Sequence, residues 1–175
     1  MNQTILKRLD AAITSTLIGH SEDPDCNVGA SICILHRGEE VYRKEYGEAD
    51  KEKHRPMKPD TIFRCYSMTK PITSVAVMTL VEKGALALSD PASKYLPGFK
   101  DQKVYTDQGL VPANREVTIQ DLLDMTAGVV YPDASFPAGA IMDKIQADFY
   151  DKIAKGEPTP STYELANIIG QQPLA

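Results

Sequence analysis

The sequence contains no tryptophan, only three cysteines and no long apolar run. No stretch approaches the roughly 18 consecutive apolar residues that a membrane-spanning helix needs, so we expect no membrane partner. The cysteines are Cys26, Cys33 and Cys65. Their odd number and the absence of a CxxC pair argue against a disulfide scaffold or a zinc site.

Histidine and positive charge are also scarce. The three histidines, His20, His36 and His54, show no metal-ligand spacing, so we expect neither a metal nor another cofactor. The 19 Lys and Arg residues stand against 24 Asp and Glu residues, a net charge of −5 at pH 7. Because phosphate binding needs a basic surface, nucleic acid is not an expected partner.

The first 20 residues alternate polar and apolar side chains and lack the apolar core of a secretory signal. A cytoplasmic location is therefore expected, unless a signal has been removed. Apolar residues recur every four positions over about 4–19, which predicts an amphipathic helix capped by Thr4 or Asn2. Strand-like segments at 28–34 and 41–46, on either side of a turn, predict a β-hairpin.

Helical patterns dominate the rest of the chain. The spacing over 67–83, followed by Gly84, predicts a helix with a C-terminal glycine. Residues 100–116 are polar and predict irregular structure. Three more helices are predicted: one from a capping box at Thr118 to Gly128, one over 138–155, and one capped by Ser161 or Thr162 that ends near Ile169. Because strands are predicted only before residue 66, the sheet is expected to be incomplete. The chain is accordingly divided into residues 1–66, with the N-terminal helix and the first strands, and residues 67–175, which are mainly helical.

One short motif carries recognisable chemistry, the SxxK element Ser67-Met68-Thr69-Lys70 at the start of a helix. Residues i and i+3 share a helix face, so the amine of Lys70 can reach the hydroxyl of Ser67. A lysine that loses its water shell can accept the serine proton, and the helix N-terminus favours the developing anion. A tetrapeptide of this kind also arises by chance, and a capping serine beside a solvated lysine is the alternative interpretation.

The surrounding sequence resembles a known family. Residues 61–99, TIFRCYSMTKPITSVAVMTLVEKGALALSDPASKYLPGF, are similar to the serine β-lactamase and penicillin-binding-protein superfamily, in its class C-like branch of esterases and peptidases. Residues 117–133, VTIQDLLDMTAGVVYPD, resemble the segment that usually reads LLTHTSGL there. The resemblance implies an α+β fold, with an antiparallel sheet flanked by helices and an inserted helical region. It also implies that Ser67 is the acylated nucleophile and Lys70 its activating partner.

The family pattern is incomplete in this chain. The K-T-G or H-x-G motif that the family carries on a strand beside its site has no counterpart, since His36-Arg37-Gly38 falls in the turn of the first hairpin. The tyrosine that completes the base is not securely placed either. Tyr131, Tyr150 and Tyr163 are the three candidates for that base. Tyr150 is interpreted instead as a surface or packing residue of the predicted helix 138–155, and Tyr131 as a candidate for the mouth of the substrate cleft, with a plain structural role as the alternative.

The last residues, IIGQQPLA, resemble the stretch just before the tyrosine-bearing segment of the family. We therefore expect only the N-terminal portion of the fold here, with the C-terminal portion of the same protein as a partner. Two functions follow. One is a serine hydrolase that acts on a small-molecule ester, amide or β-lactam through an acyl-enzyme on Ser67. The alternative is an incompetent fragment, or a degenerate homologue, that needs a complementary C-terminal portion.

Overall fold

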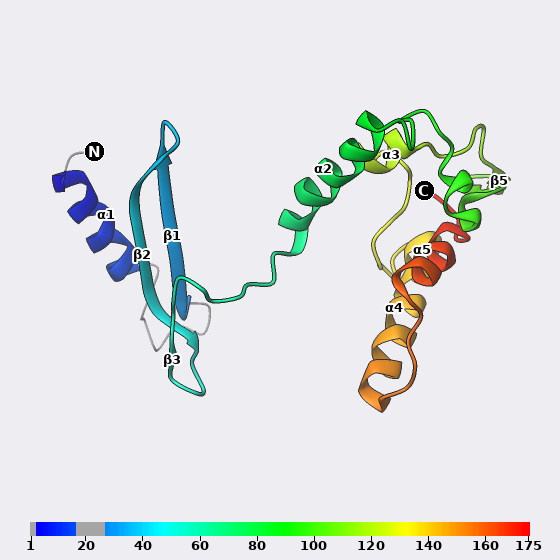
Figure 1. Cartoon of the computed structure of the whole chain (residues 1–175). Helices are drawn as coiled ribbons and strands as arrows, with labels where there is room; N and C mark the ends of the chain where they lie inside the picture. Colours follow the sequence, from blue (N-terminus) through cyan, green and yellow to red (C-terminus); the bar gives the residue numbers. More distant parts are fainter. Residues whose placement is uncertain (1–2, 17–26) are drawn as a thin grey trace. The chain divides into compact units, whose positions relative to one another are not determined.

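The computed structural model describes residues 3–16 and 27–175, and its contacts divide the chain into two compact units, Met1–Tyr66 and Ser67–Ala175. Each unit is described by itself (Figure 1). Four sequence predictions concern residues outside the described ranges: the cap Asn2, the helix end at 17–19, His20 and Cys26.

The first unit holds a helix and a three-stranded antiparallel sheet (Figure 1). Its elements are α1 (Gln3–Thr16), β1 (Gly29–His36), β2 (Glu39–Asp50) and β3 (Arg55–Pro56), with the strand order β1-β2-β3. Arg37 and Gly38 join β1 to β2 with φ values of 52° and 85°, which suit a two-residue hairpin turn. The predicted hairpin is confirmed, with both strands longer than the sequence indicated.

A polar cluster around Asp10 attaches α1 to β2. The hydroxyl of Tyr46 donates a hydrogen bond to Asp10 Oδ1 at 2.7 Å, and Lys44 forms an ion pair with the same carboxylate. The hydrogen bond from Lys44 holds the pKa of Asp10 below its usual value, whereas burial raises the pKa of Tyr46. Beside them Ile13 is only 4% exposed, so α1 lies against the sheet as its apolar stripe predicts.

The second unit is mainly helical. After a 3₁₀ turn, η1 (Tyr66–Met68), it contains α2 (Thr69–Glu82), η2 (Ala92–Lys94), η3 (Pro97–Phe99), β4 (Lys103–Thr106), β5 (Gly109–Pro112), α3 (Ile119–Leu123), α4 (Pro137–Lys155) and α5 (Thr162–Gly170). Four helices therefore occur where the sequence predicts them. The capping boxes at Thr118 and Ser161 are both present, and Gly84 follows α2 with a φ of 66°.

Two predictions for this unit were wrong. Residues 100–116 are not irregular, because β4 and β5 pair as an antiparallel hairpin to which Leu174 adds a parallel bridge at Val104. Strands of four residues are too short to show an alternating pattern, and Leu174 is distant in sequence. The helix after Thr118 ends at Leu123 rather than at Gly128, because Met125 has a φ of 59° and turns the backbone out of the helix.

The core of the second unit gathers around Phe99, with Ala92, Val117, Ala127 and Leu174. Two glycines allow η3 and α5 to approach closely. A Cβ added to Gly98 would lie 2.2 Å from the backbone oxygen of Asn167, and one added to Gly170 would lie 2.4 Å from the ring of Phe99. This packing holds the segments that follow α2 in one compact body.

Helices and small antiparallel sheets together confirm the predicted α+β class. No helix in residues 3–16 and 27–175 combines the length and the apolar character that crossing a bilayer requires.

Candidate active site

Ser67 and Lys70 meet at the start of α2. Ser67 lies in the 3₁₀ turn η1 and Lys70 is the second residue of α2. The ammonium group of Lys70 donates a hydrogen bond to Ser67 Oγ at 2.9 Å. The three-residue spacing places both side chains on one face of the helical turn, so the contact follows directly from the sequence. Both residues are exposed.

The backbone turns sharply just before Ser67. Tyr66 has a φ of 45°, a left-handed conformation that an aromatic residue rarely adopts. The N-cap residue of α2 is Met68, whose side chain makes no capping hydrogen bond. Pro71 lies in the first turn of the helix, where a backbone N–H has no intrahelical partner, so the N–H that proline lacks is not missed there. The turn therefore presents the Ser67 hydroxyl at an uncapped helix start, where the helix dipole favours negative charge.

A cavity of about 260 Å³ opens beside Lys70. Its lining comes from Lys70 and from the chain around and after α3: Leu122, Met125, Ala127, Val129, Val130 and Tyr131. The structure thus brings Tyr131 and Lys70 to one cavity, although they are 61 positions apart in sequence. Tyr131 is 71% exposed and lies at the rim, and a substrate-binding role for it stays a prediction.

A second cavity, of about 570 Å³, lies between α2 and α3 and is also lined by Lys70. Most of its walls are apolar, formed by Val77, Leu80, Leu86, Ile119, Leu122, Leu123 and Met125. Tyr95 lines it too, and its hydroxyl donates to Asp90 at 2.5 Å. Sequence reasoning missed Tyr95 and Met125, because neither has a recognisable spacing from the SxxK motif.

The two other tyrosines considered from the sequence lie on helices. Tyr150 belongs to α4, packs edge-on against Phe149 with ring centroids 6.0 Å apart, and is 60% exposed. Tyr163 belongs to α5 and is 57% exposed. The two cavities beside Lys70 take their tyrosines from positions 95 and 131 instead.

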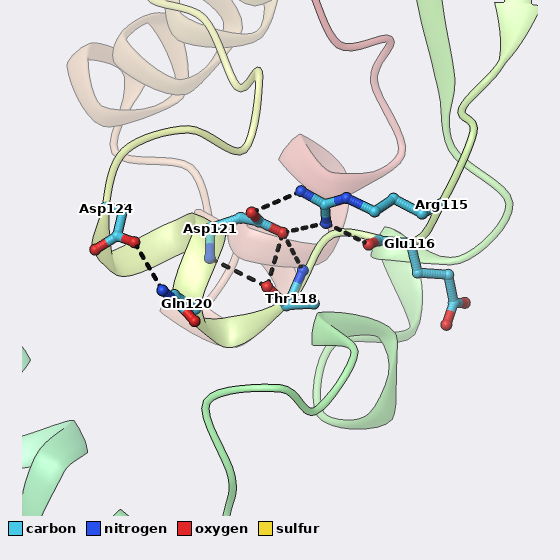
Figure 2. A network of polar contacts seen from close by, with 6 residues as sticks. All are labelled: Arg115, Glu116, Thr118, Gln120, Asp121 and Asp124. Carbon is cyan, nitrogen blue, oxygen red and sulfur yellow. Dashed lines mark hydrogen bonds and ion pairs between the residues drawn. The ribbon is translucent and has the colours of Figure 1, made fainter.

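A dense polar network fixes the start of α3, close to these cavities (Figure 2). Asp121 accepts two hydrogen bonds from the guanidinium of Arg115, at 2.5 and 2.8 Å, and two from the backbone N–H and hydroxyl of Thr118, at 2.8 and 2.7 Å. The Arg115 guanidinium is the main cause that holds the pKa of Asp121 well below its usual value. Asp121 is therefore a carboxylate throughout the neutral pH range.

No group of three or more His, Cys, Asp and Glu side chains in the described ranges is arranged to hold a metal ion. The polar side chains that line the two cavities are those of Thr69, Lys70, Thr73, Ser74, Tyr95 and Tyr131. Ser67 lines neither cavity and is connected to them through its hydrogen bond with Lys70.

The chain is similar to several known proteins over part of their length. It is 42% identical to Esterase EstB of Burkholderia gladioli over 104 residues, which are 59% of this chain and 25% of that esterase. It is 35% identical to Protein flp of Staphylococcus aureus over 114 residues, which are 65% of this chain and 22% of that protein.

Among solved structures, EstCE1, a hydrolase with promiscuous acyltransferase activity, matches with a TM-score of 0.68 and 25% identity. That match covers 98% of this chain and 41% of EstCE1, so the chain spans less than half of the relatives it matches. The family model described as Beta-lactamase matches residues 22–165. With the SxxK geometry and the fold in agreement, this match shows that the chain belongs to the Beta-lactamase family.

Proposed function

We propose that this chain supplies the nucleophile of a serine hydrolase, in which Ser67 forms an acyl-enzyme. The observation that carries the proposal is the 2.9 Å hydrogen bond between Lys70 Nζ and Ser67 Oγ at the start of α2. A nucleophile and a proton-accepting group within hydrogen-bond reach are what covalent acyl transfer requires. The esterase relatives support the same reaction class.

The chemical step begins when Lys70 is in its neutral amine form. Ser67 Oγ attacks the substrate carbonyl carbon while its proton passes to Lys70 Nζ, across the contact seen in the structure. The carbonyl oxygen becomes an oxyanion, which backbone N–H groups such as that of Ser67 would stabilise. When the tetrahedral intermediate collapses, the leaving alkoxide or amine takes the proton from Lys70. Water then releases the acid by the same sequence of proton transfers, which regenerates Ser67.

An ester or amide of a small acyl group is the proposed substrate class. Two cavities adjoin Lys70, and the larger one is walled mainly by aliphatic side chains of α2 and α3. Such walls suit an apolar acyl or alcohol group rather than a highly charged substrate. Tyr131, at the rim of the smaller cavity, is proposed to contact the substrate.

The second candidate is a chain that needs a complementary C-terminal portion before it can act. The observation that favours it is the exposure of the apolar side chains of α2, where Ile72 is 70% and Val75 65% exposed. Such residues are ordinarily buried, so we propose that further chain of the same protein covers this helix. That portion would also contribute the remaining base and the second oxyanion donor.

Intact mass spectrometry with a fluorophosphonate probe tests the proposal. We expect one covalent adduct on the wild-type chain and no adduct on Ser67→Ala, with Ser93→Ala, on η2 and outside both cavities, as the matched control that still labels. An adduct that survives Ser67→Ala would contradict the assignment of the nucleophile. A folded wild-type chain without an adduct would favour the second candidate, and the same assay with a complementary C-terminal portion added would then restore labelling.

A further inference from the structure

Asp121 connects the start of α3 to the segment that faces Lys70. Its side chain, only 13% exposed, is held by the forked contact of Arg115 and by Thr118 (Figure 2). Its backbone oxygen accepts a hydrogen bond from the N–H of Thr126 at 2.9 Å. Arg115 and Thr118 therefore fix the side chain of Asp121, and the backbone oxygen of Asp121 in turn holds the first residues after α3.

The segment that follows, residues 125–131, forms one wall of the 260 Å³ cavity beside Lys70. Its path depends on two left-handed residues, Met125 with a φ of 59° and Gly128 with a φ of 75°. Further along, the Gly128 backbone oxygen accepts from the N–H of Ala175 at 3.0 Å. A short segment held at such points has few alternative paths, so its position follows from the groups that hold it.

We propose that Asp121, clamped by Arg115, is a positioning residue that sets the 125–131 wall opposite Lys70. This inference rests on the proposed function of Ser67 and Lys70. Asp121 does not touch the reacting atoms; it acts through the segment that lines the cavity.

The contacts of Asp121 differ from those of the equivalent residue in the other capping box of this chain. α5 begins with the same kind of capping box, in which Glu164 accepts from the backbone N–H and the hydroxyl of Ser161 at 2.8 and 2.7 Å. Among the ion pairs of the described residues, Glu164 has none, whereas Asp121 has the Arg115 fork. Planar two-point contacts of this kind fix orientation as well as distance. Arg115 is therefore an additional cation that stabilises only the capping box at Thr118, which lies next to the cavity.

The test uses the 175-residue chain with the variants Asp121→Asn and Arg115→Gln, and Glu164→Gln as the matched control. Arg115→Gln removes the fork but leaves the capping box, so it reports on the clamp even if Asp121→Asn impairs folding. The first measurement is amide hydrogen exchange, read peptide by peptide. The second is the rate of Ser67 modification by the fluorophosphonate probe across a range of pH, at a temperature where circular dichroism shows each variant folded.

We expect both network variants to speed exchange in 125–131 by about tenfold or more, since each loses a charge-assisted contact. They should slow Ser67 modification by a similar factor without changing the shape of its pH profile. Glu164→Gln should speed exchange in α5 alone and leave the modification rate within about twofold. Arg115→Lys, which keeps the charge but loses the fork, should fall between wild type and Arg115→Gln.

Unchanged exchange in 125–131 in both network variants would overturn the inference, as would a modification rate that falls no further than in Glu164→Gln. Failure of the proposed function has a different signature, which is a folded wild-type chain whose Ser67 is never modified. In that case the exchange measurement by itself decides whether Asp121 holds the segment.

Discussion

The hydroxyl of Tyr95 donates a 2.5 Å hydrogen bond to the carboxylate of Asp90, beside the larger cavity that Lys70 lines. The same carboxylate accepts from the backbone N–H of Ala87 at 2.9 Å and from Lys94 at 3.0 Å. Three donors around one carboxylate lower its pKa to about 2, with the Tyr95 hydrogen bond as the largest cause. These hydrogen bonds therefore connect the turn between α2 and η2 to Tyr95, which lines the cavity.

A pH dependence of stability follows from this pKa. In the unfolded chain the pKa of an aspartate is about 3.9, so the folded state binds its proton less readily. The stabilisation by Asp90 is therefore complete above about pH 4 and is lost as the pH falls from about 4 to about 2. Urea unfolding of wild type and Asp90→Asn at several pH values should give a gap in unfolding free energy that narrows over that interval. A gap that is constant with pH would contradict the assignment.

Replacing Lys70 should remove the group that accepts the Ser67 proton. We expect Lys70→Met to slow Ser67 modification by the fluorophosphonate by about 10²- to 10⁴-fold, the range that positioned proton transfer usually contributes. Lys83→Met, at the other end of the same helix, is the matched control and should modify Ser67 at the wild-type rate. If both variants react equally fast, Lys70 is not the base.

The close approach of η3 and α5 predicts an order of stability between two glycine variants. Gly98→Ala places its methyl group 2.2 Å from the backbone oxygen of Asn167, which cannot move aside, so we expect a loss of about 1–3 kcal/mol or more. Gly84→Ala meets no atom within 4 Å and carries only the strain of a φ of 66°, about 1 kcal/mol. Thermal unfolding should rank Gly98→Ala as the less stable, and the reverse order would show that η3 and α5 pack more loosely.

Local sequence signals predicted the helices and the first hairpin because each carries its own pattern. The apolar stripe of α1, the turn at Arg37 and Gly38, and the capping boxes at Thr118 and Ser161 all lie within a few residues of what they determine. The contact between Ser67 and Lys70 is local in the same sense, because a single helical turn creates it.

The β4–β5 hairpin is local but was missed, because strands of four residues are too short to show an alternating pattern. Two other missed features join residues far apart in sequence: Leu174 adds a bridge to β4, and the segment after α3 forms a wall of the cavity beside Lys70. Neither relationship leaves a periodic trace in the sequence. Met125 is a separate case, because its left-handed φ ends α3 early and no local rule assigns that conformation to methionine.

The bridge between Val104 and Leu174, together with the hydrogen bond from Gly98 N–H to Asn167 Oδ1, has a consequence for how the second unit forms. Both contacts close loops of about 70 residues. During synthesis, Phe99 and Val117 emerge long before Leu174, the residue that completes their core. Until then their apolar surface stays open, so the nascent chain is most exposed to aggregation and to chaperone binding while residues 100–174 are being made.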